Sequence, residues 1–175
     1  VRQPALMKGY FKDEATTRSV FTDDGFLRTG DQGTVDEYGF LTITGRVKDQ
    51  FKTDKAKFIA PAPIEMKLQG NTIVDQVCVV GTGLPQPIAL MTLSEAWRER
   101  SAPEVDDEIQ KLIASVNPTL EKHEHIQTVV ILQDAWTIEA GFLTPSMKIK
   151  RNLVEKHYSP RFKEWAGNGK AVVWG

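Results

Sequence analysis

The chain has 175 residues, of which 41% are hydrophobic and 26% are charged, which is typical of globular domains. This composition excludes collagen-like, low-complexity and intrinsically disordered chains. Lysine and arginine number 22 against 23 aspartates and glutamates, a formal net charge of −1. No global basic field is therefore available for nucleic acid or an anionic membrane, and we expect no nucleic-acid partner.

Targeting and redox signals are sparse. No apolar run approaches the ~20 residues of a membrane-spanning helix, and no signal peptide is visible, so we expect a cytoplasmic protein without a transmembrane segment. The single cysteine, Cys78, lies in an apolar run and predicts a buried core residue in a reducing compartment. The chain begins at Val1 without an initiator methionine, which suggests a segment of a longer polypeptide.

The first 47 residues are predicted to be rich in β-structure. Acidic residues at the start of 13–21 predict a short helix, since the helix dipole favours them there. Alternating apolar and polar residues in 25–31 and 39–45 flank a turn-type cluster at 36–39 and predict an antiparallel hairpin.

The remaining residues mix short helices with short strands. Prolines at the start and a glycine at the end predict a helix over 61–70. Periodicity predicts strands at 74–81, 87–93 and 127–132, and helices at 103–116, 118–124, 146–158 and 161–165. This order is typical of an α+β fold and not of regular βαβ alternation.

One stretch with potential chemistry contains Asp31 in 29–31 and Arg46 in 45–49. A carboxylate beside a tight turn can accept two hydrogen bonds from a ribose diol, and a guanidinium can bind phosphate or ribose oxygens. Turn glycines and a surface salt bridge explain the same residues, so spacing leaves both interpretations open.

A second stretch, 143–151, contains Lys148. It is either a proline-containing turn that enters a basic amphipathic helix, or a turn that presents a lysine to charge developing on an anionic oxygen. His123 and His125 would lie on different faces of a helix, which favours a solvated turn over a metal site. We therefore assign no metal ligands.

Together, 29–31 and 36–49 resemble a signature of the adenylate-forming superfamily, which includes acyl-CoA synthetases, adenylation domains of peptide synthetases and firefly luciferase. The segment 143–151 resembles its C-terminal motif with the catalytic lysine. Residues 51–65 and the Leu-Thr-Pro-Ser form of the lysine motif look most like long-chain fatty acid–CoA ligases.

The resemblance implies two parts and a two-step reaction. Residues 1–47 would be the tail of a large N-terminal adenylation domain. Residues 48–175 would be a small mobile C-terminal α+β domain, an antiparallel sheet with flanking helices. Such enzymes join a carboxylate to ATP, with Mg²⁺, to give an acyl-adenylate, and then transfer the acyl group to CoA.

The resemblance also implies a role for each matching residue. Lys148 would stabilise the adenylation transition state, Asp31 would bind the ribose hydroxyls and Arg46 would assist at the ribose or phosphate. Lys52 would lie near the nucleotide in one state. Lys48 would be the hinge, where a few torsions absorb the domain motion.

One departure concerns residues 54–58, which would face the active site in the thioester-forming state. The family commonly has glycine where Ala56 stands, so the acceptor thiol is open to question. Alternatives are an acyl-adenylate ligase that delivers to an acyl-carrier protein, a carboxylate reductase module, or a free-standing non-catalytic partner domain.

The resemblance places the phosphate loop, adenine pocket and acid pocket upstream of Val1. We therefore expect the missing N-terminal domain as partner, and a fatty or related carboxylic acid, ATP and CoA as substrates of the full enzyme. This chain alone should bind none of them stably and should be inactive. We also expect it to self-associate, and the full enzyme could attach peripherally to a membrane.

Overall fold

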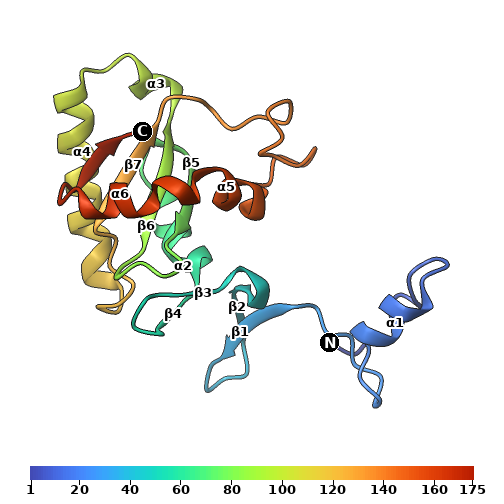
Figure 1. Cartoon of the computed structure of the whole chain (residues 1–175). Helices are drawn as coiled ribbons and strands as arrows, with labels where there is room; N and C mark the ends of the chain where they lie inside the picture. Colours follow the sequence, from blue (N-terminus) through green and yellow to red (C-terminus); the bar gives the residue numbers. More distant parts are fainter. The chain divides into compact units, whose positions relative to one another are not determined.

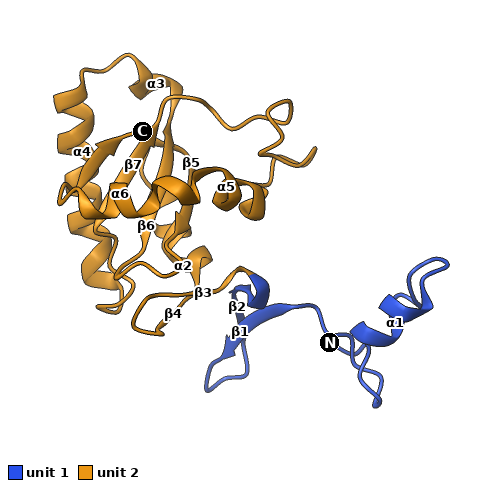
Figure 2. Cartoon of the chain, viewed as in Figure 1, with its two compact units in different colours: residues 1–48 blue, residues 49–175 orange.

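The computed structural model describes residues 1–175, which divide into two compact units, Val1–Lys48 and Asp49–Gly175 (Figure 2). A single turn of 3-10 helix, Val47–Asp49, contains the point of division. The division falls one residue after the boundary expected from the sequence.

The first unit begins with helix α1, Glu14–Val20, inside the range predicted for it. Asp13 caps this helix, because its carboxylate accepts the N–H of Thr16 at 2.9 Å. The same hydrogen bond lowers the pKa of Asp13. The cap therefore explains why the helix begins at Glu14.

An antiparallel hairpin completes the first unit, with strands β1, Asp31–Val35, and β2, Leu41–Arg46. The Asp36 carboxylate organises its turn by accepting the N–H groups of Tyr38 and Phe40. The prediction of a strand over 25–31 is wrong. Gly25 and Gly30 adopt φ values of +83° and +77°, which break the extended chain before β1 begins.

No side chain of the first unit is buried. Its exposed apolar residues include Phe11, Tyr38 and Phe40, which are 88%, 78% and 71% exposed. A hairpin with apolar side chains and no core of its own is marginally stable in isolation.

The second unit is built on a four-stranded sheet in the order β5-β6-β7-β8 (Figure 1). The strands are Val74–Val80, Ile88–Leu93, Thr128–Leu132 and Val172–Trp174. The α+β class is confirmed. Within this four-stranded sheet only β5 and β6 pair antiparallel, whereas the β6–β7 and β7–β8 pairs are parallel. Long helical connections allow this, since parallel neighbours need a crossover.

Helices cover both faces of this sheet. Alternate residues of β5 illustrate the division: Val77 and Val79 belong to one core cluster, whereas Cys78 and Val80 belong to the other. The first cluster contains α2, Pro61–Gln69, and α4, Ala102–Val116. The second contains α5, Arg151–Tyr158, and α6, Phe162–Gly167, which cross in front of the sheet in Figure 1.

Smaller elements complete the unit. Strands β3, Phe51–Lys52, and β4, Phe58–Ile59, form a short hairpin, and α3, Glu95–Arg98, follows β6. No helix in the structure combines the length and the apolar character needed to cross a membrane.

Two predicted helices are wrong in part. The helix expected over 118–124 is only a 3-10 turn, Asn117–Thr119, because the Asn117 side chain pairs with both backbone groups of Ile126 and turns the chain back. The helix expected from residue 146 starts at Arg151. The residues before it form a closed turn, in which Leu143 bridges Ile149.

Candidate functional site

Asp31 and Arg46 are brought together at the open end of the β1–β2 hairpin. The register places them opposite each other, and Arg46 Nε lies 3.6 Å from Asp31 Oδ1. The Arg46 side chain is 66% exposed and that of Asp31 is 32% exposed, so the pair is solvated and contributes little stability. The surface salt bridge expected from one interpretation of the sequence is therefore present, and it is formed by the two residues that the other interpretation assigns to nucleotide binding.

Lys48 is the last residue of the first unit and lies inside the 3-10 turn Val47–Asp49. Its position at the division between units is where a hinge residue would have to be. The hinge role itself stays a prediction.

Lys52 and Ala56 belong to the β3–β4 hairpin of the second unit. The Lys52 ammonium lies 4.6 Å from the centre of the Phe58 ring, a cation–π contact at an exposed site. Ala56 closes the turn by donating its N–H to the Thr53 carbonyl at 3.0 Å, and it does so with φ +57°. The left-handed backbone is one that glycine adopts without strain, so an alanine at this position carries a conformational cost.

Lys148 lies on an exposed turn that precedes α5, within a loop that reaches out from the sheet in Figure 1. Thr144 closes the turn on both sides: its N–H donates to the Lys148 carbonyl at 2.8 Å, and its Oγ1 accepts the Lys148 N–H at 3.0 Å. Met147 completes the turn with φ +60°. The geometry presents the lysine side chain to solvent on a tightly closed backbone.

The base of this turn is anchored in the protein interior. Leu143 is fully buried. On the other side, Arg151 donates to Glu65 Oε1 at 2.5 Å and to the Val79 carbonyl at 2.7 Å, and it approaches Cys78 Sγ at 3.2 Å. Sequence reasoning missed the Arg151–Glu65 pair, because its members are separated by 86 residues and only the fold joins them.

Cys78 is fully buried, as the sequence predicts. Burial raises the pKa of its thiol to about 12, so it stays protonated at neutral pH. Its low thiolate content makes it a poor nucleophile.

The predicted site residues fall into two sets. Asp31, Arg46 and Lys48 belong to the first unit, whereas Lys52 and Lys148 belong to the second, on separate elements. Each unit therefore supplies part of the predicted machinery.

His123 and His125 lie in and just after a turn and are partly exposed. No group of three or more histidine, cysteine, aspartate or glutamate side chains is arranged to hold a metal ion.

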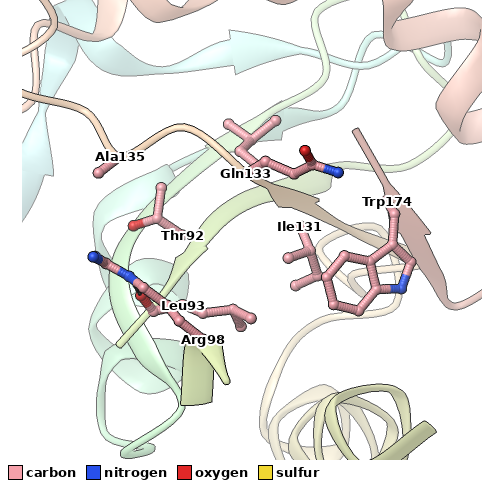
Figure 3. Close-up of a pocket in the computed structure, with 8 residues that line it drawn as sticks. Thr92, Leu93, Arg98, Ile131, Gln133, Ala135 and Trp174 are labelled. Atoms are coloured by element: carbon pink, nitrogen blue, oxygen red, sulfur yellow. Dashed lines mark hydrogen bonds between the residues drawn. The ribbon is translucent and has the colours of Figure 1, made fainter. Parts of the chain in front are cut away.

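A pocket of about 200 Å³ opens at the carboxyl ends of β6 and β7. Figure 3 shows Arg98 and Trp174 on opposite sides of it, with Gln133 between them. None of the predicted site residues lines the pocket, and its volume is below the usual range for sites that enclose a small-molecule ligand.

The fold of the chain is similar to that of domains from adenylate-forming enzymes. It superposes with a TM-score of 0.78 and 26% identity on the adenylation domain of a carboxylate reductase from Mycobacterium chelonae, and covers 92% of this chain and 26% of that one. The corresponding domain from Segniliparus rugosus, solved with AMP and a carboxylic acid, gives a TM-score of 0.76 at 25% identity over 93% of this chain and 27% of that one.

Sequence comparison agrees. Residues 48–165 match the family model of the AMP-binding enzyme C-terminal domain, and the chain belongs to that family. It is 35% identical to the long-chain-fatty-acid–CoA ligase FadD15 of Mycobacterium tuberculosis over 91% of this chain and 29% of that protein. It is 29% identical to a chloroplastic long-chain-fatty-acid–[acyl-carrier-protein] ligase of Arabidopsis thaliana, over 90% of this chain and 24% of that protein. The predicted family is confirmed, and the chain spans less than a third of these relatives.

Proposed function

We propose that this chain is the C-terminal part of an ATP-dependent acyl-CoA synthetase of the long-chain fatty acid–CoA ligase type. The observation that carries the proposal is the exposed, closed turn bearing Lys148, in a domain whose family and relatives activate carboxylates. Residues 1–47 would then be the tail of the large domain, and 48–175 the mobile domain.

In the first step, a carboxylate oxygen attacks the α-phosphorus of ATP. A P–O bond to the acid forms, and the bond to the departing pyrophosphate breaks. The Lys148 ammonium would stabilise negative charge on the oxygens involved, the kind of preorganised electrostatic contribution that dominates many enzymes. Asp31 would exchange its salt bridge for the ribose hydroxyls, and Arg46 would donate to ribose or phosphate oxygens.

In the second step, the thiol of CoA attacks the acyl carbonyl carbon and AMP leaves. Rotation at Lys48 would withdraw Lys148 and bring residues 54–58 of the β3–β4 hairpin to the site. Lys52 would lie near the nucleotide in one of these states. Mg²⁺ would be bound together with the ATP phosphates.

The acceptor thiol is the main alternative. Similarity to an acyl-carrier-protein ligase and to carboxylate reductase domains supports delivery to a carrier protein. The strained Ala56, at the position where the family commonly has glycine, raises the same question. A non-catalytic partner domain is the third alternative, and the Lys148 turn argues against it because a binding module has no evident need for such a lysine.

For the chain by itself, we propose no stable nucleotide binding and no synthetase activity. Its missing partner would be the N-terminal domain. The exposed apolar residues of the first unit favour self-association, and we propose a cytoplasmic location, with the full enzyme able to attach peripherally to a membrane.

The test is turnover by the complete polypeptide that contains this chain. Supplied with ATP, Mg²⁺, a panel of fatty acids and CoA, it should release AMP and form acyl-CoA, while residues 1–175 alone should release none. AMP release only when a phosphopantetheinylated carrier protein replaces CoA would establish the alternative acceptor. No AMP release with either acceptor would refute the catalytic proposal.

A further inference from the structure

The second unit contains a nearly buried ion pair that joins three elements. Arg151, the first residue of α5, binds Glu65 of α2, and the two side chains are only 17% and 16% exposed. The second Arg151 nitrogen donates to the Val79 carbonyl on β5, whereas Glu65 Oε1 accepts the Val79 N–H at 2.7 Å. One strand residue is therefore bound from both sides by the pair.

A buried ion pair is an inefficient source of stability, because removing both charges from water cancels most of their attraction. The arrangement instead fixes the orientation of the Arg151 side chain. The guanidinium is planar and rigid, so two simultaneous hydrogen bonds from its two ends fix its position and orientation. The start of α5 is consequently held in one place relative to α2 and β5.

Arg151 follows the predicted catalytic Lys148 by three residues, with little slack between them. Ile149 is bridged to Leu143, and the Lys150 N–H donates to the Phe142 carbonyl at 2.8 Å. The Thr144–Lys148 bonds close the turn above. The segment between Arg151 and Lys148 is therefore held by backbone contacts at each of its residues.

The same cluster reaches the start of the second unit. Asp49, its first residue, interacts electrostatically with Arg151, and so does Glu155 on the next turn of α5. The start of the second unit therefore contributes to the electrostatic environment of Arg151.

We propose that Arg151, held by Glu65, is a positioning residue that fixes the Lys148 turn to the body of the second unit for the adenylation step. This inference rests on the catalytic role proposed for Lys148. When the chain rotates at Lys48, the lysine then moves with the unit as a rigid part of it.

The test is a double-mutant cycle in the complete polypeptide: Arg151→Gln, Lys148→Ala, and both together. Adenylation is measured as acyl-adenylate formation from ATP, Mg²⁺ and palmitate, and thioester formation is measured from supplied acyl-adenylate. The matched control is Arg161→Gln, which removes an exposed arginine of the same unit that stacks on Trp165 at 4.5 Å.

We expect Arg151→Gln to lower kcat for adenylation about 10²-fold through misplacement of Lys148, with the KM for ATP unchanged. Thioester formation should be preserved. In the Lys148→Ala background, Arg151→Gln should change the adenylation rate by less than about twofold, because its effect runs through the lysine. The Arg161→Gln control should retain both rates.

Two results would overturn the inference. One is a wild-type adenylation rate in Arg151→Gln; the other is a double variant whose loss of adenylation rate equals the product of the two single-variant losses. If Arg151→Gln does not fold, Arg151→Lys replaces it in the cycle, because lysine keeps the positive charge but cannot make both hydrogen bonds of the planar guanidinium. The same two results would then overturn the inference. Wild-type adenylation by Lys148→Ala alone would instead refute the proposed function.

Discussion

Replacing Ala56 by glycine should stabilise the second unit, although the change removes a side chain. Ala56 is exposed and adopts φ +57°, so its methyl group makes no core contacts and strains the backbone. The left-handed conformation costs an L-residue roughly 1–2 kcal/mol. Glycine removes that cost but adds about 0.4–1 kcal/mol of unfolded-chain entropy. The expected net gain is about 0.5–1 kcal/mol.

The assay is thermal unfolding of the chain, where a gain of this size raises Tm by roughly 1–4 °C. Ala114→Gly is the matched control, because Ala114 is also exposed but lies inside α4. There the same change should cost about 1 kcal/mol and lower Tm. Destabilisation by both substitutions would refute the reasoning, since it would mean that the backbone strain at Ala56 is smaller than the entropy cost of glycine.

Two further predictions concern the interior of the second unit. Burial raises the pKa of Glu155, so this carboxyl group binds its proton more tightly in the folded protein than in the unfolded chain. The protonated side chain therefore favours folding, and this contribution to stability is lost as the pH rises through the folded-state pKa. Glu155→Gln should therefore raise Tm relative to wild type at pH 7 and lose that advantage below pH 4, and an equal difference at both pH values would contradict this. Leu143 is fully buried at the base of the lysine turn, so Leu143→Ala should cost about 2–5 kcal/mol in urea unfolding. A loss below about 1 kcal/mol would show that the turn is not anchored in the core.

Local signals account for the elements that sequence reasoning predicted correctly. The prolines at the start of 61–69 and Gly70 after it delimit α2, and apolar runs delimit β5, β6 and β7. These features act over a few residues, so they can be recognised without knowledge of the fold. The antiparallel β5–β6 pair follows from its short connection for the same reason.

The features that sequence reasoning missed depend on distant partners. Residues 118–124 have helical composition, but the Asn117 side chain bonds with Ile126 compete with helix formation. Strand β8 has only three residues and exists because it pairs with β7. In both cases tertiary contacts decide the local structure.

The candidate site shows the same division. The sequence resemblance identifies Asp31, Arg46 and Lys148, and the register of the hairpin places the first two together. The resemblance does not identify Glu65 as the partner of Arg151. In the sequence alone, both are charged residues of predicted helices and cannot be told apart from solvent-exposed ones. The contacts that position a functional side chain, such as the Arg151–Glu65 pair, form only in the folded protein.

The central claim is that Lys148 serves adenylation within a longer ligase. The most direct measurement is single-turnover formation of acyl-adenylate by the complete polypeptide carrying Lys148→Ala, compared with Lys156→Ala, an exposed lysine of α5. The account predicts a loss of about 10²-fold or more for Lys148→Ala alone, with thioester formation from supplied acyl-adenylate nearly unchanged. Equal losses in both half-reactions, or equal rates for the two variants, would contradict it.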